Sequence, residues 1–181
     1  MTRRLPFTAA ICLALAASVV LGQEQPFPTP KPGPEHARLK KLAGTWDATM
    51  TTPDGKKSKG VMTYKMECGD LWLTSDYQGE HEGKPFQGKG LDSYDPATKK
   101  HVGIWIDNMI TNPIQTIGTY DEKTKISTCT GECHGPDGKP MKFKFVTKTI
   151  DDDHETFEMY MIGPDGKEMK GATIDYTRRK K

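Results

Sequence analysis

The densest group of side chains that could do chemistry is Cys129, Cys133 and His134, with three residues between the two cysteines. Thiolates and imidazoles are zinc ligands, and a cysteine pair followed by histidine attaches c-type haem. Covalent haem attachment normally needs two residues between the cysteines. A structural zinc site needs a fourth ligand, and none is evident in the sequence. We therefore predict no metal site, and we interpret this segment as a strand that runs into a turn at 136–139.

The cysteine count also limits disulfide formation. Cys12 lies in an apolar N-terminal run, which leaves the odd number of Cys68, Cys129 and Cys133 in the rest of the chain. In an extended strand Cys129 and Cys133 lie on one face about 13 Å apart, too far to bridge. A bend at Gly131 would shorten this distance, and Cys68 could pair with either, so the pairing stays open.

Other residue types that bind cofactors are scattered. The five histidines share no metal-ligand spacing, and haem inside a barrel would need an inward histidine that the pattern does not place. The acidic run 151–153 lacks the glycine and glutamate that follow in a calcium loop. The eight methionines that follow Met1 could bind copper, but adaptable lining of an apolar interior is the simpler interpretation. No cofactor is predicted.

Two aspartates, Asp76 and Asp107, lie inside otherwise apolar stretches. If either faces an interior, burial requires a hydrogen-bond donor such as Tyr94, Tyr120 or Arg178. A single carboxylate without a base partner or a nucleophile does not make a hydrolase. We therefore predict no catalytic residue, and we keep both aspartates as candidate ligand contacts.

Turn chemistry divides the chain into short β-rich segments. Pro-Asp-Gly-Lys occurs three times, at 53–56, 136–139 and 164–167, and this sequence favours a tight hairpin turn. A short helix is expected at 36–42, before Gly44. Ten strands are predicted, at 45–52, 58–67, 71–80, 86–94, 101–108, 114–120, 125–133, 141–150, 155–162 and 168–178. Ten consecutive antiparallel strands avoid open edges by closing, which predicts an all-β up-and-down barrel.

Alternation along these strands predicts which side chains face the lumen. Trp46 and Met50 share a face of the first strand, as do Met62 and Tyr64 in the second. The candidate lumen residues are Trp46, Met50, Met62, Tyr64, Asp76, Trp105, Asp107, Phe157 and Met159. Local pattern leaves open whether Trp105 or its neighbours Ile104 and Ile106 point inward. A barrel of about eight or more strands can hold a small ligand if side chains do not fill it.

The N-terminus has the features of an export signal. Arg3 and Arg4 precede an apolar run at 9–21 that is too short to span a bilayer, which predicts a signal peptide over 1–22. A proline-rich linker is expected at 23–35 and the barrel domain at 36–181. The chain has 26 basic and 24 acidic residues, so loss of Arg3 and Arg4 makes the mature chain neutral. Neutrality argues against nucleic-acid binding, and no stable membrane insertion is expected after cleavage.

Several motifs together carry a family resemblance. Gly44-Thr45-Trp46 opens the first strand, and Tyr176-Thr177-Arg178 ends the last. With 90–95, 102–107 and 118–121 between them, they resemble the secreted bacterial family called domain of unknown function 1579, over residues 36 to 179. The resemblance implies a lipocalin-like (calycin) barrel in which Arg178 lies across Trp46 and Gly44 precedes it. It transfers no catalytic residue.

The leading functional hypothesis is an exported, periplasmic or extracellular barrel that binds a small apolar or amphipathic molecule in its lumen. A second hypothesis is a filled barrel that acts as a structural or interaction module through its rim loops. A third is an enzyme, haem or metal protein that uses the lumen. The sequence alone decides neither the ligand nor the oligomeric state.

Overall fold

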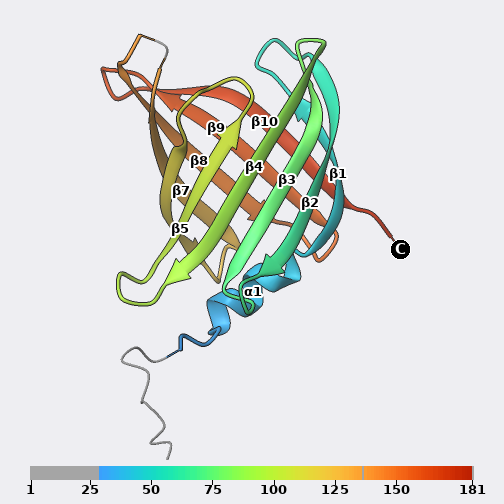
Figure 1. Cartoon of the computed structure of the whole chain (residues 1–181). Helices are drawn as coiled ribbons and strands as arrows, with labels where there is room; N and C mark the ends of the chain where they lie inside the picture. The colour runs from blue at the N-terminus through green and yellow to red at the C-terminus, as the bar shows by residue number, and fades with distance from the viewer. Residues whose placement is uncertain (1–28, 136, 181) are drawn as a thin grey trace, which may run out of the picture. The chain divides into compact units, whose positions relative to one another are not determined.

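The computed structural model describes residues 29–135 and 137–180, which contain one short helix and ten strands (Figure 1). The elements are α1 (Pro34–Lys41), β1 (Gly44–Thr51), β2 (Lys57–Glu67), β3 (Trp72–His81), β4 (Lys84–Asp95), β5 (Lys100–Asp107), β6 (Ile114–Asp121), β7 (Ile126–His134), β8 (Pro140–Thr149), β9 (His154–Ile162) and β10 (Glu168–Arg178). The signal peptide and most of the linker predicted from the sequence lie outside the described residues.

The ten strands form one closed antiparallel barrel. Each strand pairs with its neighbour in the chain, and β1 closes the barrel by pairing with β10, with Trp46 opposite Arg178. The predicted fold class is therefore confirmed, and the strand bounds differ from the predicted ones by a few residues at most. The helix begins at Pro34 rather than at residue 36, inside the predicted linker, because proline is well suited to the first turn of a helix.

Turn chemistry explains why the predicted strands ended where they did. The glycines of the three Pro-Asp-Gly-Lys repeats, Gly55, Gly138 and Gly166, have φ values of 82°, 74° and 78°. These left-handed conformations cost glycine little and other residues more. In each turn the glycine N–H donates to the carbonyl oxygen three residues earlier, at 2.9 Å. The three hairpins therefore close in the same way.

The helix α1 lies across the end of the barrel where β1, β5 and β9 begin, which we call the helix end (Figure 1). It contacts β2, β3 and β4, and its buried residues are His36 and Leu39. Among the described residues, no helix is long and apolar enough to cross a membrane.

Two buried apolar clusters form the core inside the wall. The first contains Trp46, Ala48, Met62, Tyr77 and Tyr176, and Trp46 is only 1% exposed. The second contains Ile114, Cys133 and Phe143. Trp105 packs against both, so the two clusters meet at β5.

Candidate ligand site in the barrel lumen

Many inward side chains of the barrel keep accessible surface. Met50, Tyr64, Trp105, Phe157 and Met159 are only half-buried, although four of them pack against the buried core clusters. The fifth, Met50, follows Trp46 and Ala48 on the inward face of β1. In a closed barrel, an inward side chain is reached by solvent through the lumen rather than through the wall. The inward faces that these residues line are therefore not completely buried.

Glycines in the wall allow two aromatic rings to lie flat against the backbone. A Cβ atom at Gly60 or Gly79 would overlap the ring of Tyr77, and one at Gly88 would overlap the indole of Trp105. Because these positions carry no side chain, each ring occupies the space against the strands instead of the centre of the lumen. The rings therefore make the inner surface of the wall apolar without extending far into the lumen.

The predicted lumen residue Asp107 faces inward but is already engaged. The indole N–H of Trp105 donates to Asp107 Oδ2 at 3.0 Å. The backbone N–H groups of Met109 and Ile110 donate to Asp107 Oδ1, at 2.8 and 3.2 Å. Asp107 therefore orients Trp105 and closes the turn after β5. The structure also answers the question left open at β5, since Ile104 and Ile106 lie outside, 44% and 50% exposed.

Asp76 does not belong to the lumen, which corrects the sequence-based prediction. Along β3 the buried residues are Leu73, Ser75 and Tyr77, so Asp76 lies on the outer face. It accepts a hydrogen bond from Lys89 of β4, and this contact lowers the pKa of the Asp76 carboxyl below its usual value. Asp76 lies between Ser75 and Tyr77, and the local sequence alone did not show to which face of the strand the aspartate belongs.

A polar group that the sequence analysis missed lies at the helix end of the lumen. The guanidinium carbon of Arg38, from α1, lies 4.0 Å from the centre of the Tyr120 ring. Arg38 Nη2 donates to His101 Nε2 at 3.2 Å, so His101 accepts and is neutral. Burial, and then the charge of Arg38, lowers the pKa of His101 to about 4. We call Arg38, Asp92, His101, Tyr120 and Glu155 the polar floor.

The two carboxyl groups of the polar floor differ in their surroundings. Glu155 is buried and accepts a hydrogen bond from Thr149 Oγ1 at 2.8 Å, while burial raises its pKa. Burial raises the pKa of Asp92 to about 7, against the opposing charge of Arg38. A Cβ atom at Gly103 would overlap Asp92 Oδ1 and approach Thr116 Oγ1 to 2.8 Å, so the carboxyl lies against bare backbone.

The alternation of inward and outward side chains along each strand could have predicted part of the polar floor. His101 is four residues before Trp105, so both lie on the same face of β5 and the predicted inward Trp105 implied an inward His101. The expectation that no histidine is placed in the lumen was therefore wrong. No pattern pointed to Arg38, because Lys40 and Lys41 follow it and the helix resembles a charged surface turn.

The resemblance to known barrels had suggested Arg178 across Trp46, and the structure places them together. The guanidinium carbon of Arg178 is 4.1 Å from the centre of the Trp46 ring. Arg178 also donates to the backbone carbonyl oxygens of Lys41, Ala43 and Asp152, at 2.7, 2.8 and 2.9 Å. Next to them Gly44 has a φ of 137°, and a Cβ there would approach Arg178 Nη1 to 2.9 Å. Arg178 thus ties the helix to the barrel.

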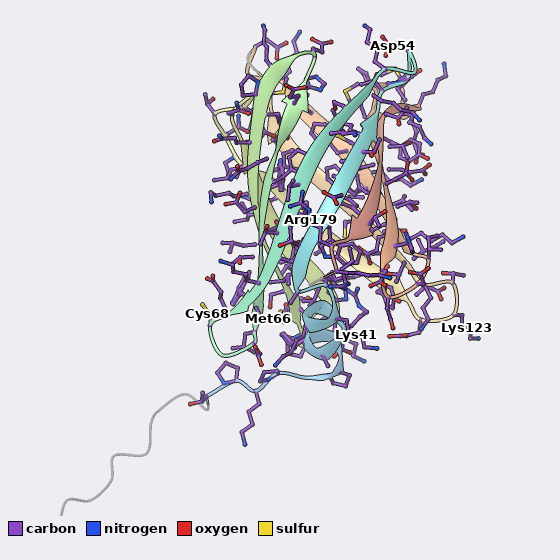
Figure 2. The ribbon with its side chains drawn as sticks, turned by 90° about the vertical axis from the view of Figure 1, so that its right-hand side faces the viewer. Lys41, Asp54, Met66, Cys68, Lys123 and Arg179 are labelled. Atoms are coloured by element: carbon purple, nitrogen blue, oxygen red, sulfur yellow. The ribbon has the colours of Figure 1, made fainter. Side chains whose placement is uncertain are left out.

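The three described cysteines are free. Cys129 and Cys133 point inward on β7, where burial raises both thiol pKa values, and His134 lies exposed on the opposite face. The three residues therefore do not converge, and the described part of the chain has no group of three or more residues placed to hold a metal ion. Figure 2 shows Cys68 at the turn between β2 and β3, at the helix end.

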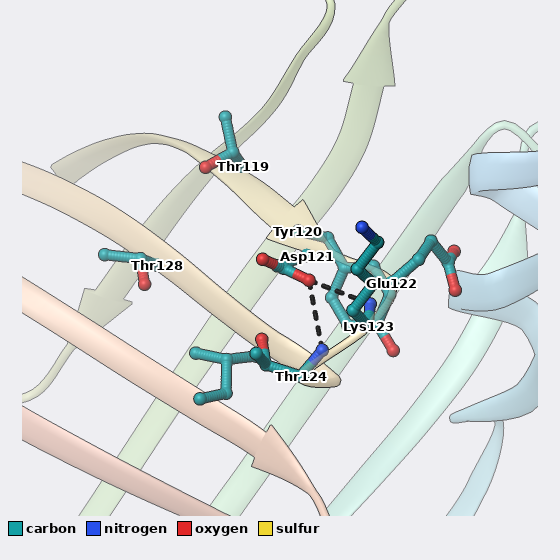
Figure 3. Close-up of a pocket in the computed structure, with 8 residues that line it drawn as sticks. Thr119, Tyr120, Asp121, Glu122, Lys123, Thr124 and Thr128 are labelled. Carbon is teal, nitrogen blue, oxygen red and sulfur yellow. Dashed lines mark hydrogen bonds between the residues drawn. The ribbon is translucent and has the colours of Figure 1, made fainter.

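A hollow of about 700 Å³ lies on the hairpin between β6 and β7 (Figure 3). Its residues are Thr119, Tyr120, Asp121, Glu122, Lys123, Thr124, Ile126 and Thr128. The Asp121 carboxylate accepts from the backbone N–H groups of Lys123 and Thr124, at 2.8 and 3.0 Å. These bonds stabilise the turn, so the carboxylate is already used, and the hollow is a weaker candidate than the lumen.

The comparisons with known proteins agree on the fold and are silent on the function. The family model described as "Protein of unknown function (DUF1579)" matches residues 31–178. No curated protein matches the chain. The crystal structure of Rv2717c from M. tuberculosis is similar, with a TM-score of 0.58 and 15% identity over 82% of this chain and 99% of that one. At that identity the similarity shows the fold alone.

Designed barrels are among the other similar structures. A redesigned beta barrel, mFAP0, bound to DFHBI, has a TM-score of 0.42 and 20% identity, over 76% of this chain and 99% of that one. A de novo fluorescence-activating beta barrel has a TM-score of 0.43 and 14% identity, over 78% of this chain and 96% of that one.

Proposed function

We propose a function from the lumen, because the chain belongs to the DUF1579 family and the description of that family assigns none. The proposal is that the barrel binds a small amphipathic molecule in its lumen. The observation that carries it is the half-buried state of inward side chains such as Tyr64, Trp105 and Phe157. A ligand in the lumen would contact the accessible surface of these side chains.

The two ends of the lumen support an amphipathic rather than a purely apolar ligand. Away from the helix end, the inward surface is aromatic and aliphatic and includes the Phe143–Phe145 stack, with ring centres 5.8 Å apart. Toward the helix end it is polar, with Arg38, Asp92 and His101. Flexible methionines such as Met50 and Met159 can adapt to the shape of an apolar tail.

An apolar fluorescent dye titrated into the protein tests this proposal. We expect saturable binding at one site, because the free lumen surface is apolar. Met159→Trp should weaken dye binding at least tenfold by filling the lumen, whereas Gln115→Trp, on the outer face of β6, should leave it unchanged. A dye that does not bind, or one that both variants weaken equally, would overturn the proposal.

A specific surface favours a second function, that of an interaction module. Leu91, Ile104 and Ile117 lie on the outer faces of β4, β5 and β6, and are 45%, 44% and 48% exposed. Leu91 pairs with Ile104 across the strands. An exposed apolar patch of this kind is typical of a contact with another protein. Replacing Ile104 with Lys should abolish such a contact while the dye still binds.

We also propose that the chain is exported, which rests on the sequence of residues 1–22. Arg3 and Arg4 before a short apolar run are the features of a cleaved signal. N-terminal sequencing of the exported protein should begin near Gln23. Protein that stays in the membrane fraction with Met1 intact would contradict the proposal.

A further inference from the structure

We propose that the polar floor selects an uncharged head group, of the carboxamide or hydroxyl class, that accepts a hydrogen bond from Arg38 and donates one to Asp92. This inference rests on the proposed function and names the chemistry of the ligand. It is carried by three features of the polar floor: a fixed guanidinium, an unpaired carboxyl and a balance of charge.

Arg38 is held in place but is not fully hydrogen-bonded. Its guanidinium stacks on Tyr120, and one N–H group is used by His101. Its Nε atom is buried without a partner among the described residues. A stacked guanidinium is oriented by its neighbours, so an acceptor on a ligand meets a preorganised donor.

Asp92 is an acceptor without a donor. Its carboxyl group makes no hydrogen bond to the described residues, whereas Glu155 has Thr149 and Asp107 has Trp105. Burying a carboxylate without a donor is costly, and a ligand that brings an N–H or O–H group removes that cost. Asp92 lies opposite Gly103, two residues along the inward face of β5 from His101, and Arg38 donates to His101. A small head group beside His101 would therefore lie between Arg38 and Asp92.

The balance of charge points to an uncharged head group. The positive charge of Arg38 interacts with the carboxyl groups of both Asp92 and Glu155. Burial shifts the pKa of every one of these groups toward its neutral form. When Asp92 is ionised, its charge balances that of Arg38, while burial favours the neutral form of Glu155. A charged head group would break this balance and lose its hydration, which the interior does not replace.

Octanamide, octanoate and octylamine test this inference, because they share a tail and differ in the head. Each is titrated directly by calorimetry at about pH 8, where most of Asp92 is ionised given its pKa of about 7. We expect octanamide to bind roughly tenfold more tightly than either charged analogue. Octanoate or octylamine binding most tightly would overturn the inference.

Two variants locate the selectivity in the floor. Asp92→Leu and Arg38→Met should each remove the preference for octanamide over the two charged analogues. Asp76→Leu, on the outer face, is the control and should preserve this preference. If both floor variants still bind the dye and still prefer octanamide, this inference is contradicted but the proposed function is not. Absence of both dye and octanamide binding contradicts the proposed function as well.

Discussion

Arg178 and Asp92 show opposite ways in which this barrel treats a charged side chain. Arg178 is satisfied by three backbone carbonyl oxygens and the face of Trp46, so it acts as a structural tie between α1 and the strands. Asp92 is partly buried on the inward face of β4 with no donor among the described residues, and burial raises the pKa of its carboxyl. Such unpaired interior groups are more typical of binding sites than of structural ones.

Replacing Arg178 with Ala should lower the free energy of unfolding by about 2 kcal/mol, because the stack and the hydrogen bonds to the end of α1 are lost together. Arg179→Ala is the matched control, since Arg179 lies exposed and pairs only with Asp47. Its loss should be well below that of Arg178. Urea unfolding of both variants measures the difference, and equal losses would reject the structural role of Arg178.

Asp92→Asn should stabilise the protein in a way that depends on pH. Between about pH 4, the ordinary pKa of an aspartate, and about 7, the folded state holds a proton that the unfolded state has released. Wild-type stability therefore falls as pH rises through this window, and asparagine removes the effect.

The stability gained by Asp92→Asn should grow from about pH 4 to about pH 7 and then stay level, at about 2–4 kcal/mol. The measurement is urea unfolding of both proteins across this range. Taking the difference cancels contributions that the two share, such as that of His101. A gap that does not change with pH would contradict the buried, unpaired state of Asp92.

At the scale of the elements, the strands were predictable and the inner surface only in part. Glycines with positive φ, such as Gly55 and Gly166, fix the turns locally, so the sequence alone reveals where strands end. Parity then assigned Trp46, Met62 and Phe157 to the inside. It could not do so for Asp76, because register and closure, which are non-local, decide which face of β3 is inward.

The same limit explains the missed polar floor. Arg38 reaches Tyr120 and His101 only because α1 lies across the end of the barrel. The separation of 63 positions between Arg38 and His101 hides that approach in the sequence. Long-range placement of a helix on a barrel leaves no local periodicity. In contrast, inward polar residues on strands, such as His101, can be predicted from the alternation of side chains once one residue of the same strand is known to face inward.

The close packing of Trp105 against a strand glycine can be tested by substitution. Gly88→Ala should cost about 2–3 kcal/mol, because a Cβ there overlaps the Trp105 indole and forces the ring toward the lumen. Tryptophan fluorescence should shift with it. Gly33→Ala is the control, since its Cβ would meet its nearest neighbour at an ordinary 3.4 Å. Equal stability of the two variants would show that Trp105 does not lie against β4.

At the scale of the whole molecule, the barrel combines a closed wall, an apolar interior and one polar end beneath α1. A filled barrel would bury its inward side chains completely, as it does Trp46 and Leu73 near the helix end. Inward residues such as Trp105 and Phe157 are only half-buried, and for this reason we propose the lumen as the ligand site. Binding in the lumen is the central claim, and the methionines can report on it directly.

The most direct test is methyl NMR of methionine-labelled protein during titration with octanamide. Met50, Met62 and Met159 lie on inward faces, whereas Met109 and Met169 are 60% and 54% exposed. The account predicts saturable shifts of the inward methyl signals, while the signals of Met109 and Met169 stay in place. Shifts confined to Met109 and Met169, or no shifts at saturating octanamide, would contradict binding in the lumen.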